Sequence, residues 1–305
     1  MNTLNYVQIL FCLMIMFVII LGSLLNYFEK YLPIFIVQIY RYGKFSYTGK
    51  SSFIKPIQVP KAWFRHFYVY STILVPATLC LTIASYYFNI EIPHWIIYVL
   101  DLTGGYYREP AVTKNHVLLA LTLLSIQCLR RFYDTQFVSV FGEKSKMDLS
   151  HYLVGFIHYT ACILAILIEA PTFARSVDTF ALSFNDFKLN DYIFTGVFLW
   201  ACLHQYRATV ILANLRKNKK GEVVSQKYQL PKGDWFDYLS SPHSTAEIIM
   251  YFSLSIILWG NITWLIIFFW VLTNQIETML LSHWWYQETF KEFPASRKVL
   301  IPYIY

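Results

Sequence analysis

The sequence predicts an all-α integral membrane protein with about seven transmembrane helices, a luminal N-terminus and a cytosolic C-terminus. Of its 305 residues, 56% are apolar and only 14% are charged, against about 25% charged in an ordinary soluble domain. The apolar residues form seven long runs, and positive charge alternates between rich and poor connecting segments. This composition excludes a disordered chain, a coiled coil and a disulfide-stapled secreted domain.

Each apolar run approaches the roughly 20 residues that a helix needs to cross about 30 Å of hydrocarbon. Lipid offers no partner to unpaired backbone groups, so each run is predicted to be a helix. The first run has no Lys or Arg before it and no small-residue cleavage site, which indicates a retained helix. The runs cover residues 6–25, 67–88, 116–129 with an extension to 132, 152–170, 192–212, 245–259 and 262–281.

The positive charges of the connecting segments support this layout. Of the 24 Lys and Arg residues outside the runs, 20 fall on one side of the membrane. The positive-inside rule places that side in the cytosol. The net charge of +7 suits an anionic ligand or the anionic cytoplasmic leaflet. The five cysteines have no metal-binding or redox spacing, so no metal site is predicted.

Polar groups gather toward the cytosolic ends of several runs. His204 and Arg207 lie in the fifth run, Glu247 in the sixth and Glu277 in the seventh. Ionisable groups inside a bilayer are costly, so they usually face the protein interior and mark function. Pro242 suits a helix start, whose free N–H groups bind anions. We expect a cytosol-facing pocket in which a soluble anionic cofactor meets a lipid-soluble substrate. Neither a dinucleotide-binding glycine motif nor a Walker A motif occurs.

Several motifs resemble the steroid 5α-reductase family. They are NLRKNK at 214–219, GDWFDYLSSPH at 233–243 with the following Ala246-Glu247, and a tail running from His283 to FPASRKVLIP at 293–302. Within that family the chain is most similar to the polyprenol (polyprenal) reductase branch. The residues that carry this second likeness are 41–44, 59–61 with Phe64, 66–68, 130–132 and 138–141.

The resemblance implies a multi-pass reductase of the endoplasmic reticulum membrane that uses NADPH. Its substrate would be a long-chain polyprenoid lipid, whose α-isoprene double bond is saturated to make dolichol for protein N-glycosylation. Its partners would be membrane lipids and a dehydrogenase that supplies the aldehyde, and no nucleic-acid partner is expected. Within one membrane domain, 1–40 would hold the first helix and the start of the cytosolic loop. Residues 41–190 would contribute the substrate cavity, and 191–305 would bind NADPH.

The family motifs also imply which residues surround the cofactor. Two departures matter. His243 stands where the branch often has Asn, and the Gln-Glu pair of the steroid-reducing branch is missing after Trp63-Phe64, which argues against a steroid as the main substrate. The cofactor-binding residues carried over by motif are Arg216, Tyr228, Asp234, Tyr238, His243, Glu247, His283, Arg297 and Lys298, with Tyr286 beside them.

The chemistry of such a reduction sharpens the expected substrate. Hydride addition to an isolated C=C has nowhere to place the developing charge, whereas a conjugated carbonyl carries it on oxygen. The enzyme then needs a hydrogen-bond donor aimed at that oxygen. His66, Tyr68 and Tyr286 are the candidate catalytic donors. We therefore expect the polyprenal aldehyde, rather than the free polyprenol, to be the immediate substrate.

Other functions fit parts of this pattern. A 3-oxo-5α-steroid reductase shares the motifs, and a membrane methyltransferase that uses S-adenosylmethionine shares a C-terminal cofactor pocket at the cytosolic face. A seven-helix receptor shares the orientation, but its ligands generally arrive from outside, whereas the polar cluster here is cytosolic. Measuring whether the protein binds NADPH or S-adenosylmethionine distinguishes a reductase from the methyltransferase.

Overall fold

The protein is described here from a computed structural model, which describes residues 3–41, 57–143, 145–175, 183, 186–218, 220–225 and 227–301. The predicted helical architecture is confirmed for these residues apart from one small sheet, and each of the seven apolar runs is helical. Residues 42–44, Lys219 and Pro302, each part of a different predicted motif, lie outside the described residues. The seven helices are α1 (Tyr6–Phe28), α3 (Phe64–Phe88), α5 (Lys114–Tyr133), α6 (Leu149–Ile168), α7 (Leu189–Asn214), α8 (Pro242–Ile257) and α9 (Ile262–Thr289).

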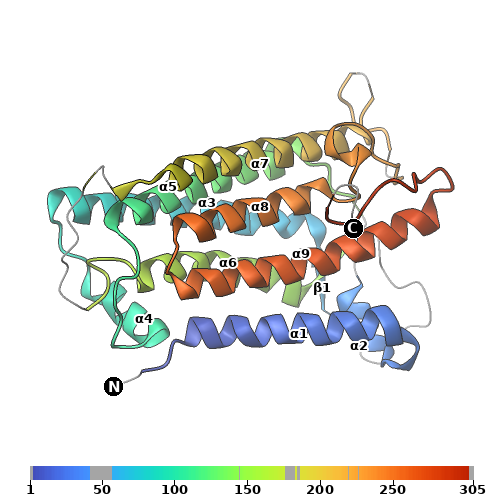
Figure 1. Ribbon diagram of the computed structural model, residues 1–305. Helices are drawn as coiled ribbons and strands as arrows, with labels where there is room; N and C mark the ends of the chain where they lie inside the picture. The colour runs from blue at the N-terminus through green and yellow to red at the C-terminus, as the bar shows by residue number, and fades with distance from the viewer. Residues whose placement is uncertain are drawn as a thin grey trace.

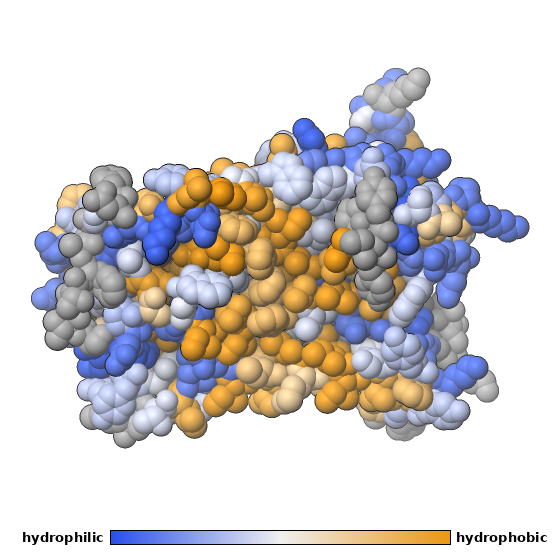
Figure 2. All heavy atoms as spheres, in the orientation of Figure 1, coloured by the Kyte–Doolittle hydropathy of each residue, from blue (hydrophilic) through white to orange (hydrophobic). Residues whose placement is uncertain are grey.

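Four helical segments are long and apolar enough to cross a membrane. They are Tyr6–Tyr31, Lys61–Phe88, Leu149–Ile168 and Ile262–Thr289. The α8 helix has only 16 residues, and α5 and α7 carry the polar side chains discussed below, so seven spans and their orientation stay a prediction. Figure 2 shows the surface expected of a membrane protein, a hydrophobic band between two hydrophilic ends.

Short elements connect the long helices. The strands β1 (Gln58–Pro60) and β2 (Lys146–Asp148) pair antiparallel, α2 spans Ile34–Tyr40 and α4 spans His94–Gly104. The sequence did not predict α4, because its 11 residues are too few for a span and follow a proline. The remaining short turns are η1 (Glu29–Tyr31), η3 (Lys61–Trp63), the π-helical η4 (Asp134–Val138) and η6 (Asp234–Asp237).

The long helices pack side by side (Figure 1). The α7 helix packs along α8 and α3 along α5, while α9 contacts α8 and α1. Trp264 and Tyr251 are fully buried between α8 and α9, with parallel rings whose centroids are 5.7 Å apart. The α1 helix lies at the edge of the bundle and exposes apolar side chains along most of its length. Such a face suits lipid rather than water.

A glycine permits the close approach of α1 to α9. A Cβ atom on Gly22 would lie 2.7 Å from Oε1 of Glu277, a distance at which the two side chains would collide. The other carboxylate oxygen, Oε2, accepts a hydrogen bond of 2.9 Å from Nδ2 of Asn26. The carboxyl group therefore occupies the volume that any larger residue at position 22 would need.

Charged side chains close the end of the molecule that bears α4. Asp101 accepts hydrogen bonds from the guanidinium groups of Arg108 and Arg175, the latter at 3.0 Å from Nε to Oδ2. Burial would raise the pKa of Asp101, but the hydrogen bonds from Arg175 and Arg108 outweigh it and lower the pKa below its usual range. The ionised carboxylate is therefore favoured in the folded state.

Candidate functional site

A buried polar network begins at Tyr68 on α3. This side chain is only 4% exposed, and its hydroxyl oxygen accepts hydrogen bonds from Nε of Arg131 at 3.1 Å and from Nη2 at 2.8 Å. The guanidinium of Arg131 also lies over the phenol ring. Because Nε and Nη2 of Arg131 both donate to the hydroxyl oxygen, the hydroxyl hydrogen of Tyr68 points to another acceptor. Tyr68 is thus arranged to donate a hydrogen bond that a neighbouring cation strengthens.

The network continues through Asp134, whose side chain is completely buried. Its Oδ2 accepts from Nη1 of Arg131 at 3.3 Å and from Nη1 of Arg130. Asp134 opens the π-helical turn η4 directly after α5, and such turns occur frequently at functional sites. Spacings of four and three residues bring Arg130 and Arg131 onto the carboxylate. The Asp134 carboxylate therefore partly neutralises the positive charges of Arg130 and Arg131.

Gln205 extends the network to α7 and α8. Its Oε1 accepts from Nη2 of Arg130, and its Nε2 donates to Oε2 of Glu247 at 2.6 Å and to the His243 carbonyl at 3.0 Å. Gln205 is 2% exposed. Buried charges and amides of this kind are weak evidence for stability and are retained where they serve a purpose. We call this set the inner network: Tyr68, Arg130, Arg131, Asp134, Gln205 and Glu247.

A second group of side chains stacks around the end of α9. The guanidinium of Arg216 lies 5.5 Å over the ring of Tyr228, whose edge meets Trp285 at 5.2 Å. Tyr286 follows, and its ring lies parallel to that of Phe293 with centroids 6.2 Å apart. Basic and aromatic side chains in alternation can hold phosphates and flat rings. We call this set the outer cluster: Arg216, Tyr228, His283, Trp285, Tyr286, Phe293 and Arg297.

Arg297 is the buried cation of the outer cluster. It is 3% exposed, its Nη2 donates to the Pro231 carbonyl at 2.8 Å, and its side chain lies over Phe293. Its Nε and Nη1 atoms are buried with no partner among the residues that the structure describes. Burial lowers the pKa of this guanidinium, so an anion that reached it would relieve both its charge and its unpaired N–H groups.

The start of α8 joins the two groups. Ser240 Oγ lies 2.7 Å from Nδ1 of His283, a buried residue of the outer cluster. Three residues later the carbonyl of His243 accepts from Gln205 of the inner network. A helix N-terminus with Pro242 in its first turn therefore lies between the outer cluster and the buried inner network, where its partial positive charge favours an anion.

The remaining predicted residues lie at varied distances from these groups. Asp234 Oδ2 lies 3.1 Å from Nδ1 of His204, whose ring stacks on Trp235. Tyr238 is 46% exposed, and Lys298 pairs through its backbone with residues 238–240. His66 is exposed and its Nδ1 lies 3.1 Å from the Tyr152 hydroxyl on α6. The structure therefore does not bring His66 to the inner network, and its catalytic role stays a prediction.

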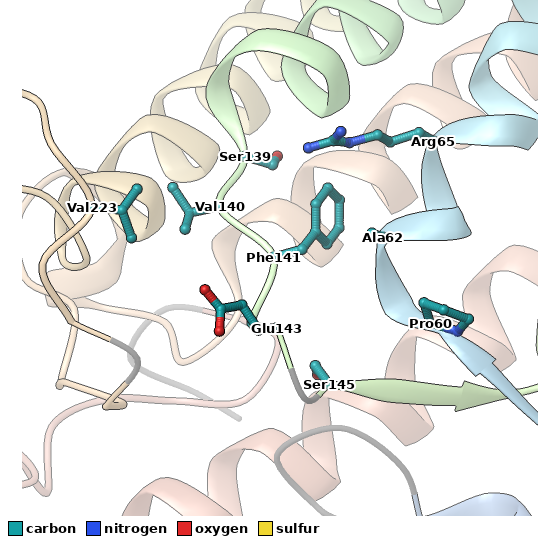
Figure 3. Close-up of a pocket in the computed structure, with 10 residues that line it drawn as sticks. Pro60, Ala62, Arg65, Ser139, Val140, Phe141, Glu143, Ser145 and Val223 are labelled. Carbon is teal, nitrogen blue, oxygen red and sulfur yellow. The ribbon is translucent and has the colours of Figure 1, made fainter.

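A pocket of about 450 Å³ opens beside the strand β1 (Figure 3). Arg65 lies along its wall with its guanidinium 5.2 Å over the ring of Phe141, and Glu143 borders the opposite side. The carbonyl of Val140, which also lines this pocket, accepts a hydrogen bond of 3.0 Å from Nη1 of Arg216 in the outer cluster. None of the inner network is among the described residues that line this pocket.

Sequence reasoning missed part of the inner network. It noted Arg130 and Arg131 as positive charges after the third run and as a family likeness, and it overlooked Asp134 and Gln205. A signal existed for Asp134, since an acidic residue three and four positions after two arginines can pair with both on one helix face. No pattern distinguishes Gln205 from any polar residue next to His204, because its partners come from distant segments.

Sequence comparisons relate this chain to known proteins. A family profile described as 3-oxo-5-alpha-steroid 4-dehydrogenase matches residues 146–305. A polyprenal reductase of Drosophila melanogaster is 36% identical over 98% of this chain and 93% of its own length. The polyprenal reductase of Caenorhabditis elegans is 34% identical over 83% of this chain and 82% of its own, and that of Homo sapiens 30% identical over 87% and 84%.

Proposed function

Since this chain belongs to the 3-oxo-5-alpha-steroid 4-dehydrogenase family, we propose that it is an NADPH-dependent polyprenal reductase. Reduction of polyprenal is the activity that its relatives' names state. The product would be the aldehyde saturated in its α-isoprene unit, on the route to the dolichol used in protein N-glycosylation. The observation that carries the site assignment is the doubly hydrogen-bonded hydroxyl of Tyr68.

The outer cluster fits the cofactor. The two unpaired N–H groups of buried Arg297 suit phosphate oxygens, and the rings of Tyr228 and Trp285 suit a flat base. Arg216 adds a second cation over Tyr228. The buried N–H groups lie in a cluster built from the basic loop after α7 and the chain after α9. These residues would hold NADPH, which supplies the hydride when bound.

The inner network fits the substrate's carbonyl. As hydride reaches the β-carbon, the C=C electron pair shifts and negative charge develops on the aldehyde oxygen. A hydrogen bond from Tyr68 to that oxygen would stabilise the charge, and Arg131 behind the phenol would reinforce it. A proton then adds to the α-carbon, and the aldehyde re-forms. Asp134 keeps Arg131 in place rather than touching the substrate.

The proposal extends to the protein's surroundings. We propose seven spans in the endoplasmic reticulum membrane, with the N-terminus luminal and the outer cluster on the cytosolic side where NADPH is available. The polyprenoid would arrive from the lipid phase, and a dehydrogenase acting on polyprenol would supply the aldehyde. Tyr68 comes from the proposed substrate region 41–190 and Glu247 from the proposed cofactor region 191–305, so the reaction would occur where the two regions meet.

Purified protein in lipid vesicles tests this function. Polyprenal, polyprenol and a 3-oxo-4-ene steroid are each supplied with NADPH, and products are separated by mass spectrometry. We expect the saturated aldehyde from polyprenal and slow or no turnover of the other two. Equal turnover of polyprenol, without any dehydrogenase or oxidised nicotinamide present, would contradict the aldehyde as substrate. Faster turnover of the steroid would favour the steroid reductase instead.

A further inference from the structure

Gln127 on α5 is a completely buried amide whose side chain has no hydrogen bond to any residue that the structure describes. Its side chain has no exposed surface, and neither Nε2 nor Oε1 has a partner among the described residues. Two other buried amides in this fold are satisfied. Gln205 makes three hydrogen bonds, and Asn261 donates to the Ala165 carbonyl while accepting from the Trp264 backbone. An unsatisfied buried amide is costly, so Gln127 calls for a partner that binds there.

Its position shows where that partner would lie. Gln127 precedes Arg130 and Arg131 by three and four residues, which places all three on one side of α5. Further buried atoms of this region lack partners among the described residues, namely Nε of Arg130, Oδ1 of Asp134 and Oγ1 of Thr245. Thr245 belongs to α8, which Gln205 ties to Arg130. Several unsatisfied polar atoms therefore lie within and beside the inner network, as expected of a site that a ligand completes.

We propose that Gln127 binds the carboxamide of the nicotinamide ring. The amide of Gln127 offers both a donor and an acceptor, and both are unpaired. An aldehyde oxygen only accepts, so a substrate carbonyl would leave Oε1 of Gln127 unsatisfied in an apolar interior. A carboxamide supplies one N–H and one C=O side by side, which satisfies both atoms at once.

This inference rests on the proposed function and adds a positioning role to it. The carboxamide is attached to the ring carbon next to the one that carries the hydride. Holding the carboxamide therefore sets which ring carbon faces the substrate near Tyr68. The cofactor's phosphates would remain at Arg297 in the outer cluster. The cofactor would therefore reach inward from the outer cluster, past the start of α8, to Gln127.

A cofactor analogue isolates this contact. In 3-acetylpyridine adenine dinucleotide phosphate a methyl group replaces the amide nitrogen, so the ring substituent keeps its carbonyl and loses its N–H. We compare dissociation constants of NADP⁺ and this analogue by equilibrium dialysis, with wild type, Gln127→Met and Gln8→Met. Gln8 is the matched control, since its Nε2 donates to Thr263 at the opposite end of α9.

Wild type and Gln8→Met should bind NADP⁺ about tenfold more tightly than the analogue, because the analogue leaves Oε1 of Gln127 unpaired. Gln127→Met should bind the two within twofold of each other. Without cofactor, thermal unfolding of Gln127→Met should occur at the wild-type temperature or above it, because an unsatisfied amide has been replaced by an apolar group of similar length.

Four results would overturn the inference. Tenfold discrimination that persists in Gln127→Met would mean that another residue reads the carboxamide, while the proposed function would stand. Equal binding of both nucleotides by wild type would mean that nothing reads it. Wild type that binds neither nucleotide would remove the proposed cofactor together with this contact. A lower unfolding temperature for Gln127→Met would count against it too, by showing that the amide is already satisfied without cofactor.

Discussion

Replacing Tyr68 by Phe removes one oxygen atom from the centre of the inner network. The ring keeps its contacts, since Phe64 and Phe67 pack against it at centroid distances of 5.3 and 4.8 Å. What is lost is the acceptor of two Arg131 hydrogen bonds and the proposed donor to the substrate oxygen. The change therefore tests chemistry with little disturbance of packing.

Two magnitudes follow. Loss of one donor to a developing oxyanion lowers kcat by about 10²–10³-fold. The unpaired Arg131 groups lower the free energy of unfolding by about 1–3 kcal/mol, because they stay buried without their acceptor. Substrate affinity should change less than turnover, since the donor matters most when charge develops on the oxygen.

Single-turnover reduction of polyprenal by enzyme saturated with NADPH measures the effect. Tyr70→Phe is the matched control, because Tyr70 lies on the same helix and its hydroxyl pairs with Thr160 at 2.7 Å, away from the inner network. We expect a large rate loss for Tyr68→Phe and a rate near wild type for Tyr70→Phe. A wild-type rate in folded Tyr68→Phe, or equal losses in both variants, would refute the role of Tyr68.

Further predictions concern the cofactor, the helix contacts and pH. Arg297→Lys should weaken NADPH binding at least tenfold in equilibrium dialysis, because one ammonium cannot replace the two unpaired N–H groups of the buried fork; unchanged affinity would place the phosphates elsewhere. Gly22→Ala should lower the free energy of unfolding by about 1–3 kcal/mol, because the added Cβ meets the Glu277 carboxyl. Gly196→Ala is the control and should be neutral or stabilising, because nothing lies within 4 Å of its added Cβ. A larger loss of stability in Gly196→Ala than in Gly22→Ala, measured by thermal unfolding, would contradict the α1–α9 packing. The lowered pKa of Asp101 means that its carboxylate stabilises the fold above about pH 4 and that this contribution falls as pH drops through the folded-state pKa. Asp101→Asn should remove this fall in stability at low pH when unfolding is measured as a function of pH. An unchanged pH dependence would rule out the pairing of Asp101 with Arg108 and Arg175.

Hydropathy predicted the long helices well, because a run of apolar residues in a membrane protein has no alternative to a helix. Its limits show at α4 and at α5. The α4 helix is too short to stand out, and its place depends on Asp101 meeting Arg108 and the distant Arg175. The α5 helix ends at Tyr133, one residue beyond the predicted extension to 132, and the arginines in its last turn pair with Asp134.

The candidate site was predicted in outline only. Motifs located Tyr68, Glu247 and Arg297, since each lies in a recognisable stretch. They could not reveal that Arg131 supports Tyr68, because that contact joins residues 63 positions apart. Nor could they single out Gln127, whose significance lies in hydrogen bonds that the surrounding side chains fail to make.

In the proposed mechanism, hydride from NADPH adds to the conjugated double bond of polyprenal while Tyr68 stabilises the aldehyde oxygen. Transfer of deuterium is the decisive measurement. Purified protein is given polyprenal and NADPH deuterated at the transferring position of its nicotinamide ring, and the product is mapped by mass spectrometry. We expect one deuterium on the β-carbon of a saturated aldehyde. Deuterium on the aldehyde carbon, with the double bond intact, would show carbonyl reduction and contradict this mechanism.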